Sequence, residues 1–197
     1  MFRFIGSFTF LWLVMATTAM AQSTTILDTN GQPLTSGVEY YVLPAATDTA
    51  GGLTLVNRTG SCPFYVGQEP LSTVNCSISQ GLPVGFTPMM ENSVCKRGYS
   101  FTVSFSASTT CVRSTGWRLD NDEEVSRTFI VTGGDQSFFR IQIDDNGLYN
   151  LIWCPVCDRP NCPRFRCLDA SIFLENGKRL LIVGEDQAFP FRFRRAN

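Results

Sequence analysis

Short segments that alternate apolar and polar residues, separated by glycine-containing turns, recur along most of the chain. Phe101–Phe105 reads Phe-Thr-Val-Ser-Phe, and Phe189–Phe193 reads Phe-Pro-Phe-Arg-Phe. This alternation is typical of half-buried β-strands, because successive side chains of a strand point to opposite faces. The strand-like segments are Tyr40–Leu43, Leu53–Val56, Phe101–Phe105, Thr128–Val131, Phe138–Ile143, Tyr149–Trp153, Ala170–Leu174, Leu180–Val183 and Phe189–Phe193.

The turn residues, together with the absence of a helical apolar period, also indicate the fold class. Asp145-Asn146-Gly147 and Glu175-Asn176-Gly177 predict tight hairpins, because Asn-Gly readily adopts positive φ. Past the N-terminal segment, no window of about 11 residues keeps a 3.6-residue apolar period. The sequence therefore predicts an all-β barrel or sandwich, and no linker divides it into two domains.

The first 21 residues have the pattern of a secretory signal peptide. Arg3 precedes the apolar run Phe4–Met15, and Ala19-Met20-Ala21 is a small-x-small cleavage site. A disordered apolar tail is the alternative. The run is too short for a membrane span and no second long run follows, so we expect a secreted domain of residues 22–197 and no membrane partner.

Charge and composition exclude several function classes. The chain has no histidine, which removes His-dependent triads and His-ligated zinc. Its 16 Lys and Arg residues balance 17 Asp and Glu residues, so nothing favours a nucleic-acid partner. The acidic run 120–124 lacks the ligand spacing of a calcium loop, and we interpret it as a solvated turn. We expect no enzyme activity, no cofactor and no metal.

All eight cysteines lie after the predicted signal peptide, at positions 62, 76, 95, 111, 154, 157, 162 and 167. An even number in a secreted chain indicates four disulfides, whose connectivity the count alone leaves open. The tight cluster 154–167 also has spacing suited to a structural zinc or a redox pair. Disulfides are favoured because the compartment is oxidising and Pro155, Pro160 and Pro163 make the segment a stiff loop.

Two sequons fit a secreted glycoprotein. They are Asn57-Arg58-Thr59 and Asn75-Cys76-Ser77. The second is the weaker acceptor, because its central cysteine is expected in a buried disulfide.

Several short blocks follow one another in a characteristic order along the chain. After the predicted signal peptide the first are Ile26-Leu27-Asp28-Thr29-Asn30-Gly31-Gln32-Pro33-Leu34 and Gly37-Val38-Glu39-Tyr40-Tyr41-Val42-Leu43-Pro44. They are followed by Gly51-Gly52-Leu53, Cys62-Pro63, Gly81-Leu82-Pro83-Val84, Trp117-Arg118-Leu119, Phe138-Phe139-Arg140-Ile141, Tyr149-Asn150-Leu151-Ile152-Trp153-Cys154-Pro155 and Lys178-Arg179-Leu180. In this order the blocks resemble the plant Kunitz-type (soybean trypsin inhibitor-like) family, which includes miraculin-like proteins. The resemblance implies a β-trefoil of twelve strands with pseudo-threefold symmetry.

The resemblance also implies disulfide pairs. It pairs Cys62 with Cys111, and Cys154 with Cys167 around a nested Cys157–Cys162 bridge. Cys76 and Cys95 then remain, and we pair them by elimination and proximity.

The same resemblance implies a monomeric protease inhibitor that presents one exposed loop to a secreted or vacuolar endopeptidase, most naturally a serine protease. That loop falls on Thr87–Ser93, with Pro88, Met89, Met90 and Glu91 at the reactive site. Met90 would enter the primary pocket, or Met89 if the register slips by one. The alternative is that both methionines fill the core. The expected location is the apoplast, with the vacuole as a second destination, and the expected roles are plant defence or control of endogenous proteolysis.

Two departures from the family pattern affect specificity. Trypsin prefers Arg or Lys, so Met90 suits chymotrypsin-, elastase- or subtilisin-like enzymes, unless Lys96-Arg97 lies in the loop. Ser36 occupies the position of an asparagine that braces the loop in the family. The alternatives are therefore a non-inhibitory miraculin-like trefoil, with a storage, taste-modifying or ligand-binding role, and a cysteine protease inhibitor that uses other loops.

Overall fold

The structure, a computed structural model, describes residues 25–46, 50–70, 79–90, 93–154 and 166–196. The strands are β1 (Glu39–Pro44), β2 (Leu53–Val56), β3 (Tyr65–Gln68), β4 (Val84–Pro88), β5 (Phe101–Phe105), β6 (Trp117–Asp122), β7 (Arg127–Thr132), β8 (Phe139–Ile143), β9 (Tyr149–Trp153), β10 (Leu168–Glu175), β11 (Lys178–Gly184) and β12 (Pro190–Arg195). Within those ranges, no helix is long and apolar enough to cross a membrane.

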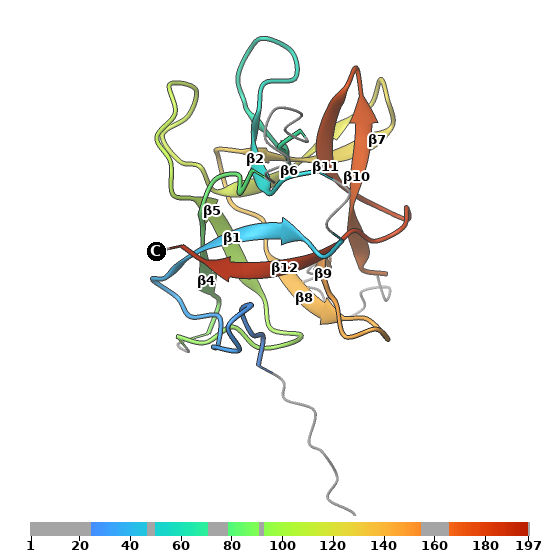
Figure 1. Cartoon of the computed structure of the whole chain (residues 1–197). Coiled ribbons are helices and arrows are strands. Elements are labelled where there is room, and N and C mark those ends of the chain that lie inside the picture. The colour runs from blue at the N-terminus through green and yellow to red at the C-terminus, as the bar shows by residue number, and fades with distance from the viewer. Residues whose placement is uncertain (1–24, 47–49, 71–78, 91–92, 155–165, 197) are drawn as a thin grey trace, which may run out of the picture.

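Six of the strands close into a barrel. They pair in the order β12, β1, β4, β5, β8 and β9, and β9 pairs back to β12. Every one of these pairings is antiparallel, and Figure 1 shows β1 and β12 crossing the front of the barrel. Because the ring of strands is closed, it has no unpaired edge strand. A short open sheet would expose such edges.

Three hairpins cover one end of the barrel. They are β2–β3, β6–β7 and β10–β11, and their inner strands β3, β7 and β11 pair with one another. Each third of the chain thus supplies two barrel strands and one hairpin, which is the β-trefoil arrangement. The fold class predicted from the sequence is confirmed.

One hydrogen bond recurs at a similar place in each third of the chain, where a residue one or two positions before a barrel strand donates to the first strand of a hairpin. The three bonds run from Leu82 N to Leu53 O (2.8 Å), from Ser137 N to Trp117 O (2.9 Å) and from Phe189 N to Ala170 O (2.9 Å). The accepting residues have very different side chains. The threefold symmetry is therefore one of backbone geometry and is hard to recognise as repeated sequence.

Aromatic side chains fill the interior. The ring of Phe86 contacts those of Phe101 and Phe193 edge to face, with centroids 5.4 and 5.5 Å apart. Trp117 packs in the same way on Phe139 and is 1% exposed. Burial of each such side chain contributes about 1.5–3 kcal/mol, so this cluster supplies much of the stability of the fold.

The alternation predicted for β5 is observed, because Phe101, Val103 and Phe105 are buried and the residues between them are half-buried. The strands β3, β4 and β6 have no counterpart among the predicted segments. Each has a composition that weakens a strand pattern: glycine in β3 and β4, and acidic residues in β6. Pairing with neighbouring strands overrides these local preferences.

Of the two predicted Asn-Gly hairpins, one is tight and the other is longer. Asn176 and Gly177 have φ of 50° and 76°, and Glu175 pairs directly with Lys178. At the β8–β9 turn, between Asp144 and Leu148, only Gly147 has positive φ. Asp144 N donates to Leu148 O, and this hydrogen bond encloses a loop of three residues. The prediction of a two-residue turn there is wrong, because the Asp144 carboxylate accepts bonds from the turn's own N–H groups and stabilises the wider loop.

Two of the four predicted disulfides are formed within the described residues. Cys62 bonds to Cys111, with Cα atoms 5.3 Å apart, and Cys154 bonds to Cys167. Cys62–Cys111 joins the β2–β3 loop to the β5–β6 loop and closes 49 residues of sequence separation. A loop of that length stabilises by about 4 kcal/mol in the chain-entropy model. Cys157 and Cys162 lie outside the described residues, as does Cys76.

The predicted Cys76–Cys95 bridge is wrong, because Cys95 is a free thiol. Its main chain is fixed on both sides to the N-terminal segment, through Leu34 O and Ile26 N, and its side chain lies in the core at 2% exposure. Burial raises the pKa of the Cys95 thiol to about 11, so it stays protonated.

An ion-pair cluster joins the three hairpins of the cap. Arg58, in the β2–β3 loop, lies 2.6 Å from a carboxylate oxygen of Asp122 and 2.6 Å from one of Glu175. Its guanidinium stacks over Phe129, 4.3 Å from the ring centroid. Asp122 belongs to the acidic run that we interpreted as a solvated turn. That interpretation is wrong for Asp122, because the fold places Arg58 against it.

Candidate functional site in the β4–β5 loop

The predicted reactive residues lie where β4 leaves the barrel. The β4–β5 ladder runs from Val84 opposite Phe105 to Pro88 opposite Phe101, and Met89 N still donates to Ser100 O at 2.9 Å. Pro88 is thus the last strand residue, and Met89 and Met90 follow it directly. Glu91 and residue 92 lie outside the described residues.

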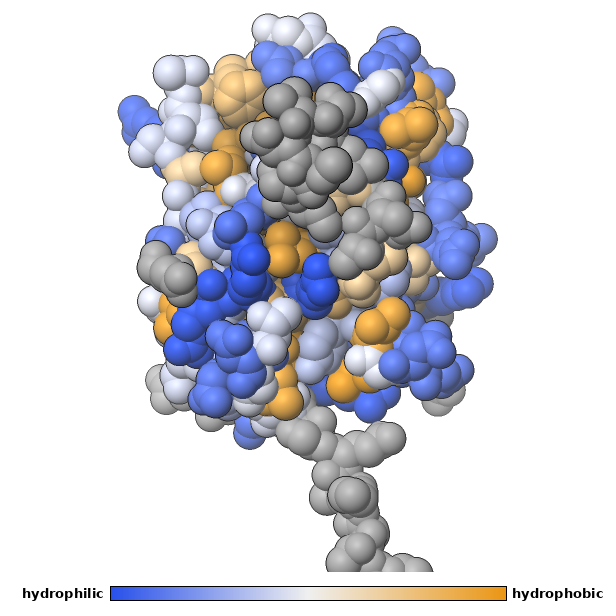
Figure 2. Space-filling model, viewed as in Figure 1, coloured by the Kyte–Doolittle hydropathy of each residue, from blue (hydrophilic) through white to orange (hydrophobic). Residues whose placement is uncertain are grey.

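Both methionines project into solvent. The exposed fraction is 64% for Met89 and 58% for Met90, so the alternative that they fill the core is wrong. On the face seen in Figure 2, hydrophobic areas are small and are separated by hydrophilic residues. Among the described residues, Met89 and Met90 are the two exposed large hydrophobic residues that are consecutive in sequence, and such side chains suit an apolar pocket on a partner.

The return side of the loop is fixed to the N-terminal segment. Ser36 N donates to Ser93 O at 2.6 Å, and Thr35 forms a β-bridge with Val94. Thr35 N in turn donates to the hydroxyl of Tyr40, a fully buried residue of β1. Figure 1 shows the blue N-terminal segment beside this loop at the bottom of the view. The loop is therefore anchored to the barrel on one side and to the N-terminal segment on the other.

Ser36 contacts the loop through its main chain. The bond to Ser93 uses the Ser36 N–H, a group that almost any residue at this position would supply. The serine side chain is therefore not required for this contact.

Lys96-Arg97, the alternative site for a trypsin-like enzyme, lies in a tight turn. Tyr99 N donates to Lys96 O at 3.2 Å, and Gly98 has φ of 78°. A protease binds its substrate in an extended conformation, and this turn lacks it. Met89 instead continues the β4–β5 ladder through its bond to Ser100 O, so the geometry favours the Met89–Met90 side of the loop.

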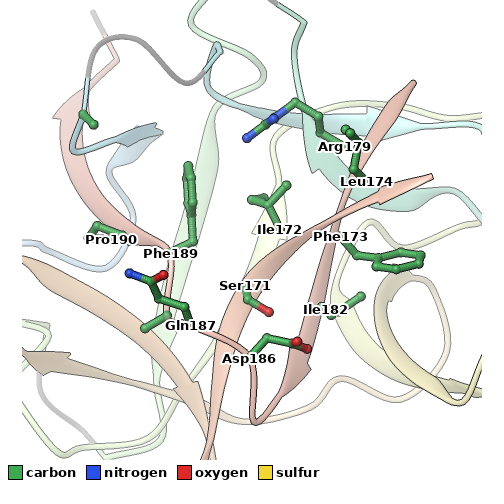
Figure 3. Close-up of a pocket in the computed structure, with 12 residues that line it drawn as sticks. Ser171, Ile172, Phe173, Leu174, Arg179, Ile182, Asp186, Gln187, Phe189 and Pro190 are labelled. Atoms are coloured by element: carbon green, nitrogen blue, oxygen red, sulfur yellow. The ribbon is translucent and has the colours of Figure 1, made fainter. Parts of the chain in front are cut away.

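Apart from the loop, a concave feature lies between β10, β11 and the segment before β12 (Figure 3). It is a hollow of about 460 Å³ into which Arg179, Ser171 and Asp186 face. Arg179 is bonded to Gln68 at 2.7 Å, and Asp186 is paired with Arg127 at 2.7 Å. Within the described part of the chain, the Ser171 hydroxyl is buried without a partner, but a chain without histidine has no imidazole base to activate it.

The first predicted glycosylation site lies on the surface. Asn57 is exposed in the β2–β3 loop, where its side-chain oxygen accepts a bond from Gly60 N at 2.6 Å. Asn75 lies outside the described residues. Use of either sequon stays a prediction.

The fold and this loop define a disulfide-bonded β-trefoil that displays a short, doubly anchored loop with an apolar tip. The Kunitz legume family, described as "Trypsin and protease inhibitor", matches residues 26–195. The chain therefore belongs to this family of protease inhibitors, and it is not an enzyme.

Relatives of known name agree with this assignment. The chain is 38% identical over 197 residues to Kunitz type trypsin inhibitor 111 of Medicago truncatula, covering 94% of this chain and 93% of the relative. It is 30% identical to miraculin of Synsepalum dulcificum, covering 85% and 81%. Among solved structures, a Kunitz type trypsin inhibitor from Cicer arietinum superposes with a TM-score of 0.74 at 29% identity, covering 88% of this chain and 99% of that one.

Proposed function

We propose that the protein is a secreted inhibitor of serine endopeptidases that presents Met90 to the primary pocket of its target. The observation that carries the proposal is the exposure of Met90, at 58%, on a loop bonded to β5 before it and to the N-terminal segment after it. Family membership supports the inhibitor class, and the loop supports this mode of binding.

Anchoring at both ends favours inhibition over simple cleavage. A loop held in its bound shape loses little conformational entropy on binding, so more of the contact energy appears as affinity. Hydrolysis of Met90–Glu91 would consume one water and leave a carboxylate on Met90 and an amine on Glu91. Because Met89 and Ser93 stay bonded to the rest of the protein, the two ends remain close enough for resynthesis, which releases that water.

The identity of Met90 selects the class of protease. Methionine is apolar and flexible, so it fits the apolar slot of chymotrypsin-, elastase- or subtilisin-like enzymes. It supplies no cation for the buried carboxylate of a trypsin-like pocket. We therefore propose a target with an apolar primary pocket, acting in the apoplast or the vacuole.

A non-inhibitory trefoil is the second candidate. It is favoured by Ser36, whose short side chain replaces the bracing asparagine of the family, and miraculin is among the relatives. A cysteine protease inhibitor that acts through another loop is a third candidate.

An inhibition panel distinguishes these candidates. Oxidised, glycosylated protein is assayed against trypsin, chymotrypsin, elastase, subtilisin and papain, together with Met90→Glu and the neighbouring control Met89→Glu. We expect inhibition of at least one enzyme with an apolar pocket, lost in Met90→Glu and retained in Met89→Glu. Inhibition of papain alone, or of no enzyme, would overturn the proposal.

A further inference from the structure

The last strand of the barrel carries arginines on its outer face. In β12, Phe191 and Phe193 point into the core and are 2% and 3% exposed, so the alternating residues Arg192 and Arg194 face outward. In the ranges that the structure describes, neither of these two arginines forms an ion pair. β1 and β12 cross the front of the barrel in Figure 1, and Figure 2 shows strongly hydrophilic residues in the same area. The positive charge on this face is therefore available to an anionic partner.

A pocket of about 470 Å³ lies where this face meets the N-terminal segment. Its lining residues are Asn30, Tyr41, Gln80, Arg194 and Arg195, and we call it the β12 pocket. They come from the N-terminal segment, β1, the segment before β4, and β12, so the fold brings distant parts of the chain together here. All five side chains carry polar groups, whereas most small-molecule pockets have largely apolar walls. Such a lining suits a ligand that is itself polar.

Both guanidinium groups of the β12 pocket have donors without acceptors. Among the described residues, Arg194 Nη2 and Arg195 Nε are buried and have no hydrogen-bond partner. The guanidinium carbon of Arg194 lies 5.6 Å from the ring centroid of Tyr41, and this stacking orients the group without using its N–H donors. A buried donor without an acceptor is unfavourable, and an oxygen atom of a ligand would supply the missing acceptor.

The charge of the β12 pocket matches that of one carboxylate. Arg195 Nε lies 3.5 Å from Oδ2 of Asp28, whose side chain is fully buried, so this acid offsets one of the two arginines. The positive charge that remains, on Arg194, suits an anion with a single charge. A guanidinium can bind a carboxylate through two parallel N–H bonds. The side-chain amides of Asn30 and Gln80 both donate and accept hydrogen bonds, as the recognition of hydroxyl groups requires.

A further cation extends the site along the strand. Arg192 lies two residues before Arg194 on the same face, at a separation of about 7 Å along the strand. Its Nε is also buried and has no partner among the described residues. The exposed acid on this face of β1, Glu39, lies beyond the other end of the row, where its carbonyl accepts a bond from Ala196 N. A single small anion could not reach both arginines, but a chain of acidic units could.

We propose that the β12 pocket binds a carboxylate-bearing sugar, and that Arg192 binds the next acidic unit of the same oligosaccharide. In this assignment Arg194 binds the carboxylate, and the amides of Asn30 and Gln80 bind the sugar hydroxyls. None of these residues belongs to the β4–β5 loop. Binding would therefore hold the protein on an acidic polysaccharide while the Met89–Met90 loop stays accessible.

The test is an NMR titration of the nitrogen-15-labelled protein at pH 6 and low salt, where sugar carboxylates are ionised. The probes are trigalacturonic acid, galacturonic acid, the neutral trimer maltotriose and inorganic phosphate. We expect trigalacturonic acid to bind most tightly and to shift the amide signals of the β12 pocket. Arg194→Gln should weaken this binding at least about tenfold, because it removes a charge-assisted pair of hydrogen bonds.

Matched variants separate a built site from general attraction between charges. Arg97→Gln removes the same charge from the exposed turn before β5 and should leave the affinity for trigalacturonic acid unchanged. Gln80→Ala, at an exposed position, should weaken binding a few-fold without affecting the fold. Arg192→Gln should weaken binding of the trimer and leave that of galacturonic acid unchanged. Thermal melts check that each variant folds.

Several results would overturn the proposal. These are no binding of trigalacturonic acid, equal binding of maltotriose, equal or tighter binding of phosphate, and an Arg97→Gln variant that loses as much affinity as Arg194→Gln. The first two exclude an acidic-sugar site, the third indicates a site for simple anions, and the fourth indicates attraction by net charge alone. Protease inhibition by Arg194→Gln should equal that of wild type, so this proposal and the inhibitor proposal can fail separately.

Discussion

The amide of Ser36 donates a 2.6 Å hydrogen bond to the carbonyl of Ser93, and this bond ties the exposed β4–β5 loop to the N-terminal segment. The support is a main-chain contact. It therefore persists although the asparagine that braces this loop in the family is replaced by serine. Position 36 therefore has two distinct properties, which are the identity of its side chain and the main-chain N–H that makes this contact. A comparison of side chains alone does not distinguish them.

Substitutions at position 36 can separate these properties. Ser36→Ala keeps the N–H and should leave inhibition unchanged. Ser36→Pro removes the donor, and we expect inhibition about tenfold weaker, from the loss of one main-chain hydrogen bond, with faster dissociation. Inhibition kinetics measure both, and Ser36→Asn should slow dissociation if its side chain reaches the loop. An Ala variant as weak as the Pro variant would show that the hydroxyl matters.

Replacing Met90 should change the target class. Met90→Arg should create trypsin inhibition at the β4–β5 loop. The same change should weaken chymotrypsin inhibition at least about a hundredfold, because an apolar pocket would receive an unpaired charge. Inhibition constants for the two enzymes check this. Arg introduced at Met89 serves as the register control, and trypsin inhibition from that variant alone would move the assignment by one residue.

Cys95 should be unreactive in the folded protein. Burial at 2% exposure and a pKa of about 11 leave little thiolate at pH 8. Alkylation with iodoacetamide, followed by peptide mapping, should label Cys95 only after unfolding. Cys62 and Cys111 are the internal control, since they should be labelled only after reduction. A peptide that links Cys76 to Cys95 would contradict the structure.

The Arg58 cluster should make stability fall in acid. The hydrogen bonds and charge of Arg58 lower the pKa of Asp122 and of Glu175, so both carboxylates bind protons less readily when folded than when unfolded. Their contribution is fully present above the unfolded pKa of about 4 and is lost as the pH falls through the lower folded values. Wild type should therefore lose more of its melting temperature between pH 6 and pH 2 than Arg58→Gln does, a change that keeps the Asn57 sequon. Parallel curves for the two proteins would contradict this coupling.

Some strands and one turn could be predicted from local sequence patterns. The alternation in β5 follows from the period of two along a strand, and the Asn176-Gly177 turn follows from the φ values that this pair accepts. Such features depend on neighbours in sequence. The position of the methionine pair follows instead from the family resemblance, since β4, which precedes it, has no recognisable strand pattern.

Other features depend on residues far apart in the chain. Leu53, Trp117 and Ala170 accept equivalent hydrogen bonds, although their side chains differ greatly in size. Close packing depends on the combined volume of side chains from all three thirds, so equivalent positions need not carry similar residues. The threefold symmetry therefore cannot be recognised as a repeat in the sequence. The cluster of Arg58, Asp122 and Glu175 forms only because three hairpins converge.

The sequence by itself determined the β-strands with clear alternation, one tight turn and the family to which the chain belongs. Only the tertiary structure decided that Cys95 is buried as a free thiol, that Met90 is exposed and that Ser36 reaches Ser93. The physical reason is that burial and main-chain pairing depend on which distant segments the closed barrel brings together. No local pattern contains that information.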